Sequence, residues 1–204
     1  QPVWSHQLML KKVFPYLKED RPSVFVLLDN LRYDQWKIIE PVIAELFSIE
    51  EEDFSFSILP TTTQYSRNAL FAGLMPADIE KHYPDWWLND NEEGGKNLKE
   101  PDLFANLVKR SLQKDLKFEY FKVTNASHGK NLVDSAHNLL QNNLSLIVYN
   151  FIDMLSHART EMEVLKELAS DEKAYRSLTK SWFMHSPLWA TLQKISQQKV
   201  QLFI

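Results

Sequence analysis

Asp153 and His157, four positions apart, form a local pattern well suited to holding a metal ion. Residues with this spacing lie on one face of a helix. A carboxylate oxygen and an imidazole nitrogen arranged in this way can both reach one Zn²⁺ at about 2.0–2.2 Å. The alternative is structural, with Asp153 as a helix cap and His157 in a local packing or hydrogen-bonding contact.

A second group is the run Thr61-Thr62-Thr63, which precedes Ser66 and Arg67. A hydroxyl at a helix N-terminus lies beside backbone N–H groups that favour an anion. A hydroxyl is a weak nucleophile at its free pKa, and metal coordination activates it. The alternative is that a threonine serves only as the helix N-cap, with Arg67 on a solvated or salt-bridged face.

The third group is Asp29, which ends an apolar run over residues 23–28. It could bind a metal, cap a helix that starts at Leu31, or accept a phosphoryl group as in a receiver domain. The receiver role requires a lysine at the end of a later strand, and no lysine is well placed for it. The capping and metal-binding roles both remain open.

Each of the three groups follows a strand-like run, and these runs cover residues 23–28, 53–60 and 144–152. In open α/β sheets, ligand sites form outside the carboxyl ends of the strands. A carboxylate, a threonine cluster and an aspartate–histidine pair at that edge would suit a metal-assisted hydrolase.

Helical patterns separate the runs, and strands alternating with helices predict an α/β fold with a mostly parallel sheet flanked by helices. Residues 84–101, rich in Pro, Asn, Gly and acidic side chains, predict a surface loop. We expect Asp102 to cap the helix that follows. Further strands are expected at 117–123 and 200–204. The expected helices cover residues 5–19, 33–47, 66–74, 102–116, 129–141, 154–168, 171–183 and 187–198.

Composition narrows the class of protein. The 204 residues are 44% hydrophobic and 12% aromatic, enough for a buried core in one large domain. The net charge of −4 argues against a general nucleic-acid-binding surface, although a nucleotide in a cleft stays compatible. The absence of cysteine excludes disulfides and thiolate metal sites, which fits the cytoplasmic location we expect. No apolar run approaches the roughly 20 residues of a membrane span.

The threonine segment resembles the nucleophile segment of the alkaline phosphatase superfamily. The matching pattern is T-x-x-S-R, followed by an apolar pair and Gly73. In this alignment Thr63 falls on the nucleophile, and Ser66 and Arg67 fall on the S-R pair. The sulfatase branch carries C-x-P-S-R instead, and Tyr65 replaces its proline, so the chain is not a sulfatase.

Longer segments resemble the PglZ domain of that superfamily. They include residues 28–36 (LDNLRYDQW) and 149–159 (YNFIDMLSHAR). They are particularly similar to the PglZ output domain of PorX-type response regulators of the Bacteroidetes. The resemblance implies an alkaline-phosphatase-like α/β fold that is truncated at its C-terminal end. It also implies that residues 1–20 are the tail of an upstream helical linker and residues 21–204 a partial PglZ domain.

The resemblance implies two Zn²⁺ ions in the intact domain. Asp29 and Thr63 would hold one ion, and Asp153 and His157 would hold the other. Thr63 would attack phosphorus in line and form a phosphothreonine, which water then hydrolyses.

Two further residues, Arg67 and Asn30, are candidates to contact the substrate phosphate. The family also carries a T-x-D-H-G-like segment and a later histidine, which would lie beyond Ile204. Each ion would then keep only part of its ligand shell, because zinc usually takes at least three protein ligands. We therefore expect this chain alone to bind zinc weakly or not at all and to be inactive.

The function implied for the intact domain is a zinc-dependent phosphoesterase, with diester nucleotides or oligonucleotides as substrates, in the output domain of a two-component response regulator. The competing hypothesis is a regulatory module that binds a sigma factor or another signalling protein without catalysis. A homodimer formed through the full-length protein is compatible with both, and we expect no membrane partner.

Overall fold

The computed structural model describes residues 2–112 and 115–204, with side chains described throughout except at 158–160, 165 and 166. The chain divides into two compact units. Unit 1 comprises Gln1–Leu17 and Glu51–Leu116, and unit 2 comprises Lys18–Glu50 and Lys117–Ile204. Unit 1 is therefore built from two separate stretches of chain, and so is unit 2.

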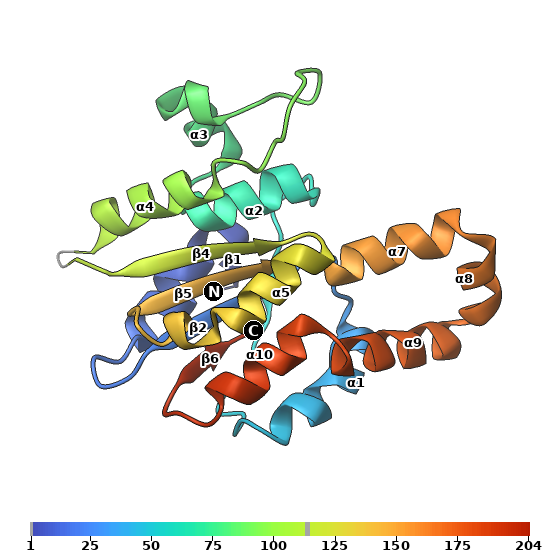
Figure 1. Ribbon diagram of the computed structural model, residues 1–204. Coiled ribbons are helices and arrows are strands. Elements are labelled where there is room, and N and C mark those ends of the chain that lie inside the picture. The colour runs from blue at the N-terminus through green and yellow to red at the C-terminus, as the bar shows by residue number, and fades with distance from the viewer. Residues whose placement is uncertain (1, 113–114) are drawn as a thin grey trace. The chain divides into compact units, whose positions relative to one another are not determined.

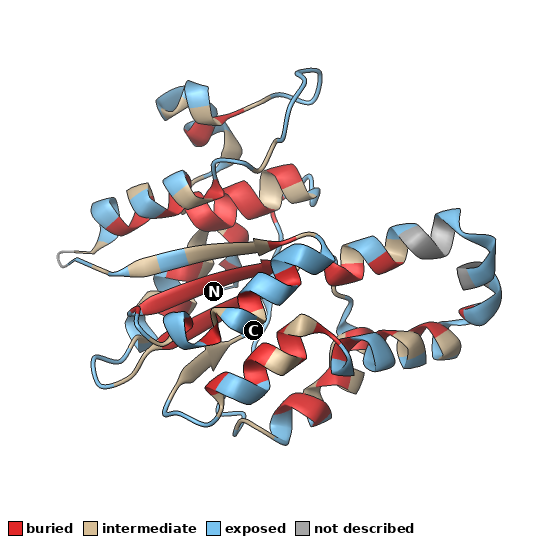
Figure 2. Ribbon diagram, viewed as in Figure 1, coloured by how far each residue is buried: buried red, intermediate tan, exposed pale blue. Residues whose placement is uncertain are grey.

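Within the described part of unit 2, a four-stranded parallel sheet forms the centre of the fold (Figure 1). Its strand order is β4 (Phe118–Val123), β5 (Leu144–Tyr149), β2 (Ser23–Leu28) and β6 (Gln201–Phe203). Every residue of β5 is buried, and Figure 2 shows this strand red along its length. A strand that is buried on both faces consists of consecutive, mostly apolar residues. This run of apolar residues is why the sequence predicted a strand here.

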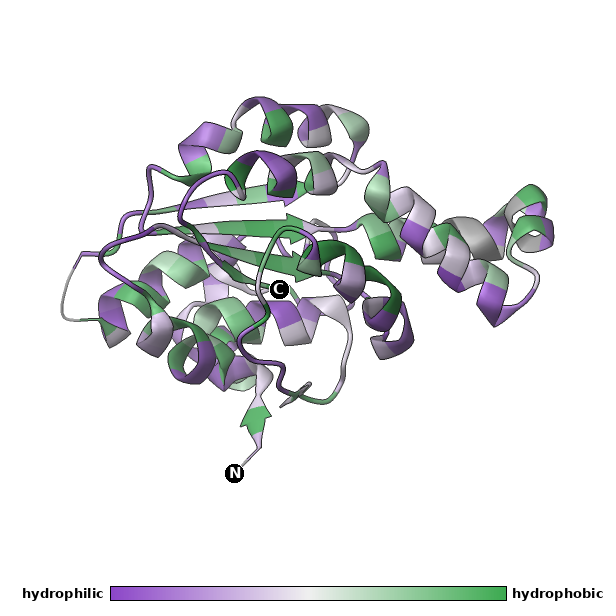
Figure 3. Cartoon of the chain, turned by 90° about the horizontal axis from the view of Figure 1, so that it is seen from below, coloured by the Kyte–Doolittle hydropathy of each residue, from purple (hydrophilic) through white to green (hydrophobic). Residues whose placement is uncertain are grey.

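Alternate residues of these strands face one apolar cluster. Val24 and Val26 of β2 and Ile147 and Tyr149 of β5 all belong to it, as the two-residue period of a strand requires. Figure 3 shows the strands of this sheet as mostly green, the colour of hydrophobic residues. The helices of unit 2 are α1 (Tyr33–Ala44), α5 (Ala126–Asp134), α6 (Ala136–Leu139), α7 (Phe151–Glu161), α8 (Glu163–Leu168), α9 (Glu172–Met184) and α10 (Pro187–Ile195).

Unit 1 is organised around two helices, α2 (Thr63–Ala72) and α4 (Glu100–Ser111). Phe71 of α2 and Phe104 of α4 are fully buried, with ring centroids 6.3 Å apart. The helix α2 ends at Gly73, whose φ of 62° is the left-handed conformation that glycine adopts without strain. The other elements are β1 (Val3–Trp4), η1 (Ser5–Gln7), η2 (Met9–Val13), η3 (Phe14–Tyr16), β3 (Ser55–Phe56), α3 (Pro76–His82) and η4 (Pro84–Trp86).

The expected strand over residues 53–60 is wrong for most of its length. Only Ser55–Phe56 is a strand, and it pairs in parallel with Val3–Trp4 rather than joining the four-stranded sheet. The alternation of Phe and Ser suggested one buried face, but Phe54 and Phe56 are 65% and 54% exposed. A strand needs a partner of matching length, and β1 supplies only two residues.

Several helix boundaries also differ from expectation. The helix α2 begins at Thr63 instead of Ser66, and α7 begins at Phe151, so residues 150–152 do not extend β5. The expected cap Asp102 lies instead in the first turn of α4, with Lys99 at the N-cap position. A carboxylate in the first turn still interacts favourably with the helix dipole.

Residues 5–19 were expected as a helix interrupted near Pro15, and the structure has the short elements η1, η2 and η3 there. Gln1–Leu17, which we expected as part of a linker tail, belongs to unit 1, where Met9 and Val13 are buried. The strand expected at 200–204 is present as β6 and pairs with β2. None of the described helices is long and apolar enough to cross a bilayer.

Candidate functional site

Asp29 lies directly after β2, at the carboxyl end of the sheet in unit 2. Its backbone N–H donates to the carbonyl of Tyr149 at 3.2 Å, which extends the ladder between β2 and β5 by one bond. The residue is buried, with 9% of its surface exposed. Asn30 follows in an exposed turn with a φ of 60°, a left-handed conformation that asparagine tolerates better than most residues.

The helix-capping role proposed for Asp29 is wrong. The N-cap of α1 is Arg32, whose backbone N–H donates to the side-chain oxygen of Gln35 at 3.1 Å. Asp29 is three residues upstream of that cap, and its metal-binding role stays a prediction.

Asp153 and His157 come together as their spacing predicted. His157 Nε2 lies 3.7 Å from Asp153 Oδ1, and the two side chains are 68% and 30% exposed. Asp153 is the third residue of α7, which rules out the N-cap position for it. Because α7 follows β5 directly, this pair lies beyond the carboxyl end of β5, the strand adjacent to the one that carries Asp29.

The donor types of these side chains fit zinc, but their number falls short. Carboxylate oxygen and imidazole nitrogen are ligands that Zn²⁺ takes in both structural and catalytic sites. Among the residues that the structure describes, no group of three or more His, Cys, Asp or Glu side chains is placed to hold a metal. Asp153 and His157 would therefore supply only two ligands of a shell that needs at least three.

Thr63 is the first residue of α2 and is half-buried. The N-cap position belongs to Thr62, whose side chain makes no capping hydrogen bond in the described part of the chain. Thr63 lines a cavity of about 660 Å³ in unit 1. The other residues that line it are Pro60, Thr62, Gln64, Tyr65, Asp90, Lys96 and Asn97.

The walls of this cavity are held by polar contacts between α2 and the loop that precedes α4. The hydroxyl of Tyr65 donates to Asp90 Oδ2 at 3.1 Å, and burial together with this carboxylate raises the pKa of Tyr65. Lys96 Nζ donates to the carbonyl of Glu92 at 2.5 Å. The segment over residues 87–99 has no helix or strand and is mostly exposed, as its composition predicted, and these contacts fix part of it beside Thr63.

Arg67, a candidate phosphate contact, lies in a buried ion pair. Its Nε and Nη2 atoms donate to the two carboxylate oxygens of Glu100 at 2.8 and 2.6 Å. The side chains of Arg67 and Glu100 are only 4% and 0% exposed. A guanidinium engaged in this way joins α2 to α4 and presents little surface to a substrate.

Sequence reasoning missed Glu100 and Asn97, which contact the segment around Thr63. Both lie within the stretch read as a surface loop, and no spacing rule relates them to α2. The only available signal was Arg67 itself, because a buried arginine requires a carboxylate partner. That rule does not say which of the chain's 27 acidic residues the partner is.

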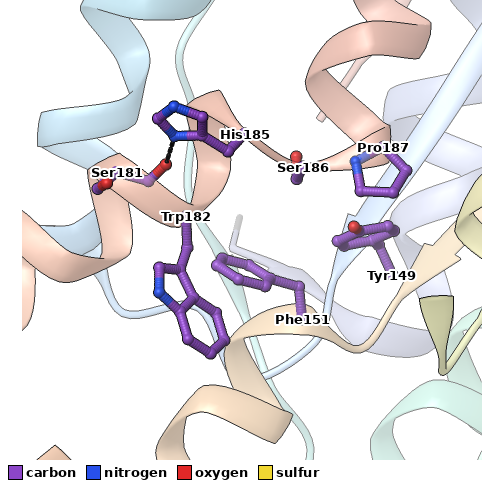
Figure 4. A pocket seen from close by; sticks show the side chains of 7 residues that line it. All are labelled: Tyr149, Phe151, Ser181, Trp182, His185, Ser186 and Pro187. Atoms are coloured by element: carbon purple, nitrogen blue, oxygen red, sulfur yellow. Dashed lines mark hydrogen bonds between the residues drawn. The ribbon is translucent and has the colours of Figure 1, made fainter.

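A second cavity, of about 470 Å³, lies in unit 2 near the start of α7 (Figure 4). Phe151 and Trp182 form one wall, with ring centroids 5.6 Å apart. His185 is exposed, and its Nδ1 is 2.7 Å from the carbonyl of Ser181. Burial raises the pKa of Tyr149 at the base of this cavity.

Comparison with known proteins agrees with this fold. Residues 8–200 match the family model described as the BREX system PglZ alkaline phosphatase-like domain. A search of curated proteins finds no match. The match spans most of the chain, and the parallel α/β sheet flanked by helices is consistent with an alkaline phosphatase-like fold. Membership of that superfamily points to a phosphoesterase-type hydrolase. The chain belongs to the PglZ family of alkaline phosphatase-like domains.

Proposed function

We propose that this chain is the main part of a zinc-dependent phosphoesterase that cleaves phosphodiesters of nucleotides or oligonucleotides. The observation that supports it best is the Asp153–His157 pair, at 3.7 Å beyond the carboxyl end of β5, in a chain of the PglZ family. That edge is where open α/β sheets build their sites. The diester preference and the nucleotide class come from the family resemblance alone.

In this proposal Thr63 is the nucleophile. Its hydroxyl oxygen attacks phosphorus, an Oγ–P bond forms, and the bond to the leaving alcohol breaks on the opposite side. The threonine proton passes to solvent, and the leaving oxygen takes a proton in return. Water then attacks the phosphothreonine, and two inversions give net retention. The backbone N–H groups in the first turn of α2 favour the negative charge of the phosphate.

As the family resemblance implies, Asp29 and Thr63 would hold one Zn²⁺ and Asp153 and His157 a second, each with further ligands. Zinc, when bound, would lower the pKa of the hydroxyl and offset charge on the phosphate oxygens. Asn30, exposed in its left-handed turn beside Asp29, remains a candidate phosphate contact. The fit of Arg67 to that role is poor, because Glu100 already engages its guanidinium.

The second candidate function is a regulatory output module of a cytoplasmic response regulator. Such a module would bind a sigma factor or another signalling protein, alone or as a homodimer, without catalysis. One observation favours it: the described residues include no group of three or more His, Cys, Asp or Glu side chains placed to hold a metal ion.

Hydrolysis of a chromogenic phosphodiester and of its monoester by the natural full-length protein tests the proposal. Each assay is run with and without added zinc. We expect zinc-dependent diester cleavage, and we expect Thr63→Ala to lower kcat by more than about a thousandfold, as loss of a nucleophile does. Thr61→Ala is the matched control, because Thr61 carries a nearby exposed hydroxyl and is not one of the residues that line the cavity beside Thr63.

The outcomes separate the two functions. Zinc-dependent cleavage that Thr63→Ala abolishes and Thr61→Ala preserves would establish the enzyme and its nucleophile. No cleavage of either ester by zinc-saturated protein would favour the regulatory module. Equal activity in Thr63→Ala and the unmodified protein would refute Thr63 as the nucleophile.

A further inference from the structure

We infer that Asn97 is a positioning residue that fixes the orientation of Thr63 from a largely buried polar cluster that contacts the first turns of α2. The cluster consists of Arg67, Asn68, Asn97 and Glu100, all in unit 1. This inference rests on the proposed function for its catalytic meaning. Its geometric content, that Asn97 restrains the Thr63 peptide, can be tested separately.

The base of the cluster is the ion pair between Arg67 and Glu100. Both side chains are almost completely removed from solvent. The two nearly parallel hydrogen bonds, at 2.8 and 2.6 Å, set the direction of the Glu100 carboxylate as well as its place. Glu100 is the first residue of α4, so the carboxylate is carried by a packed helix rather than by a loose loop.

Asn97 joins this carboxylate to the residue proposed as nucleophile. Its Nδ2 lies 3.0 Å from Glu100 Oε1 and 3.3 Å from the backbone carbonyl oxygen of Thr63. The same nitrogen lies 3.2 Å from Asn68 Oδ1. Asn68 is 1% exposed, and its own Nδ2 donates to the carbonyl of Lys96 at 2.9 Å, which holds the loop beside Asn97.

A hydrogen bond to the Thr63 carbonyl acts on the direction of the Thr63 side chain. It restrains the peptide plane that follows Thr63, and with it the Cα–Cβ bond that aims the hydroxyl. Ser66 restrains the preceding residues, since its Oγ lies 3.3 Å from the Thr61 carbonyl and 3.1 Å from the Thr62 carbonyl. The peptides on both sides of Thr63 are thus tied down.

Asn97 is also placed where a substrate would meet Thr63, because both residues line the 660 Å³ cavity. The contacts of Asn97 with Glu100 and Thr63 give the buried Arg67–Glu100 ion pair a role in fixing the geometry around Thr63. Such pairs contribute little net stability compared with apolar residues, so a role in specifying geometry is a reason to keep one. A misplacement of reacting atoms by about 1 Å can cost about a hundredfold in rate.

The test compares Asn97→Ala and Asn97→Asp with Asn106→Ala in the natural full-length protein. Asn97→Asp keeps the size of the side chain but loses the N–H donors. Asn106 is a matched control: it is half-buried in unit 1, and its Oδ1 accepts hydrogen bonds from Tyr83 and Arg110 rather than from residues near Thr63. The readouts are kcat and KM for the phosphodiester, the thermal midpoint, and hydrogen–deuterium exchange of peptides covering residues 61–68.

We expect both Asn97 variants to lower kcat by about ten- to a hundredfold with KM within about twofold of the unmodified value, because misorientation of the nucleophile affects the chemical step. Exchange in residues 61–68 should become faster in both. Asn106→Ala should match Asn97→Ala in thermal midpoint but leave kcat and the exchange of that segment unchanged.

The two hypotheses can fail separately. Unchanged exchange at residues 61–68 in Asn97→Ala would overturn the restraint on Thr63, and so would unchanged kcat in an active protein. If the unmodified protein hydrolyses no ester, the proposed function fails and the catalytic meaning of the restraint fails with it. The exchange measurement still decides whether Asn97 holds the Thr63 peptide.

Discussion

Each unit of the molecule contains an arginine–carboxylate cluster, and the two have opposite environments. In unit 1, Arg67 and Glu100 are 4% and 0% exposed and form a bidentate pair. In unit 2, Arg32 contacts Asp34 and Glu172, and Arg176 also reaches Asp34 at 3.2 Å, with all four side chains 34–52% exposed.

The difference lies in what happens when one partner is lost. A surface charge that loses its partner is solvated by water, so the exposed cluster of unit 2 can tolerate a substitution. A buried charge has no such alternative, so Arg67 and Glu100 depend on one another. Chemically similar contacts therefore have different consequences, and unit 1 places the dependent pair beside the proposed nucleophile.

The largest effect is expected from Glu100→Gln, which leaves the buried guanidinium of Arg67 without a countercharge. We expect the free energy of unfolding to fall by about 3–5 kcal/mol, as measured by urea denaturation. Asp34→Asn in the exposed cluster should cost less than about 1 kcal/mol. Similar losses for the two variants would contradict the contrast between the clusters.

A double replacement sharpens the same point. Arg67→Met combined with Glu100→Leu removes both charges and keeps apolar volume, so we expect it to be more stable than Glu100→Gln by about 2 kcal/mol or more. If the Glu100 carboxylate holds Asn97 in place, hydrogen–deuterium exchange at residues 61–68 should still be faster in this double variant than in the unmodified protein. If the double variant is less stable than Glu100→Gln, the ion pair itself contributes more to stability than the avoidance of an unpaired buried charge does.

An intermediate effect is expected from exchanging arginine for lysine. The ammonium group of lysine is a point charge and cannot form the bidentate hydrogen bonds that an arginine guanidinium makes with a carboxylate. We expect Arg67→Lys to cost about 1–3 kcal/mol of unfolding free energy, because part of the Glu100 carboxylate loses its partner while buried. Arg32→Lys, its counterpart in unit 2, should cost less than about 0.5 kcal/mol. Thermal and urea unfolding of the two variants, side by side, would measure this difference.

The smallest effect is a pH dependence from the exposed cluster. Hydrogen bonds from Arg32 are the main reason that the pKa of Asp34 falls from 3.8 to about 2. A depressed carboxylate pKa contributes stability above the ordinary value, and this contribution is lost as pH falls from about 4 to about 2. Because the cluster is exposed, we expect only a few tenths of a kcal/mol. Urea titrations at pH 5 and pH 3 should show a smaller drop in Asp34→Asn than in the unmodified protein.

Local patterns were the part of the structure that the sequence predicted. The strands β2 and β5 were found because continuous apolar residues identify a buried strand within a short window, and the half-buried β6 was found from a shorter apolar run. The Asp153–His157 contact was found because four-residue spacing acts within one helix. The family itself was recognised from its motifs, and the match to residues 8–200 confirms it.

Contacts between distant residues were the part that could not be predicted. The segment at 53–60 alternates like a strand, but whether it pairs depends on a partner about fifty residues away. Arg67 and Glu100 are separated by 33 residues, and Asn97 by 34 from Thr63. No periodicity links such positions, so the buried cluster around Thr63 became visible only in three dimensions.

The sheet order in unit 2 also has a consequence for biosynthesis. Its strand β6 pairs with β2, so Gln201 lies next to Ser23, 178 residues earlier in the chain. At the usual rate of roughly 5–20 residues per second, a ribosome needs roughly 10–35 s to make the intervening segment. During that interval at least one edge of β2 is unpaired, which is the kind of edge that recruits other chains. The nascent protein would therefore benefit from a chaperone that shields β2 until its last neighbour has been translated.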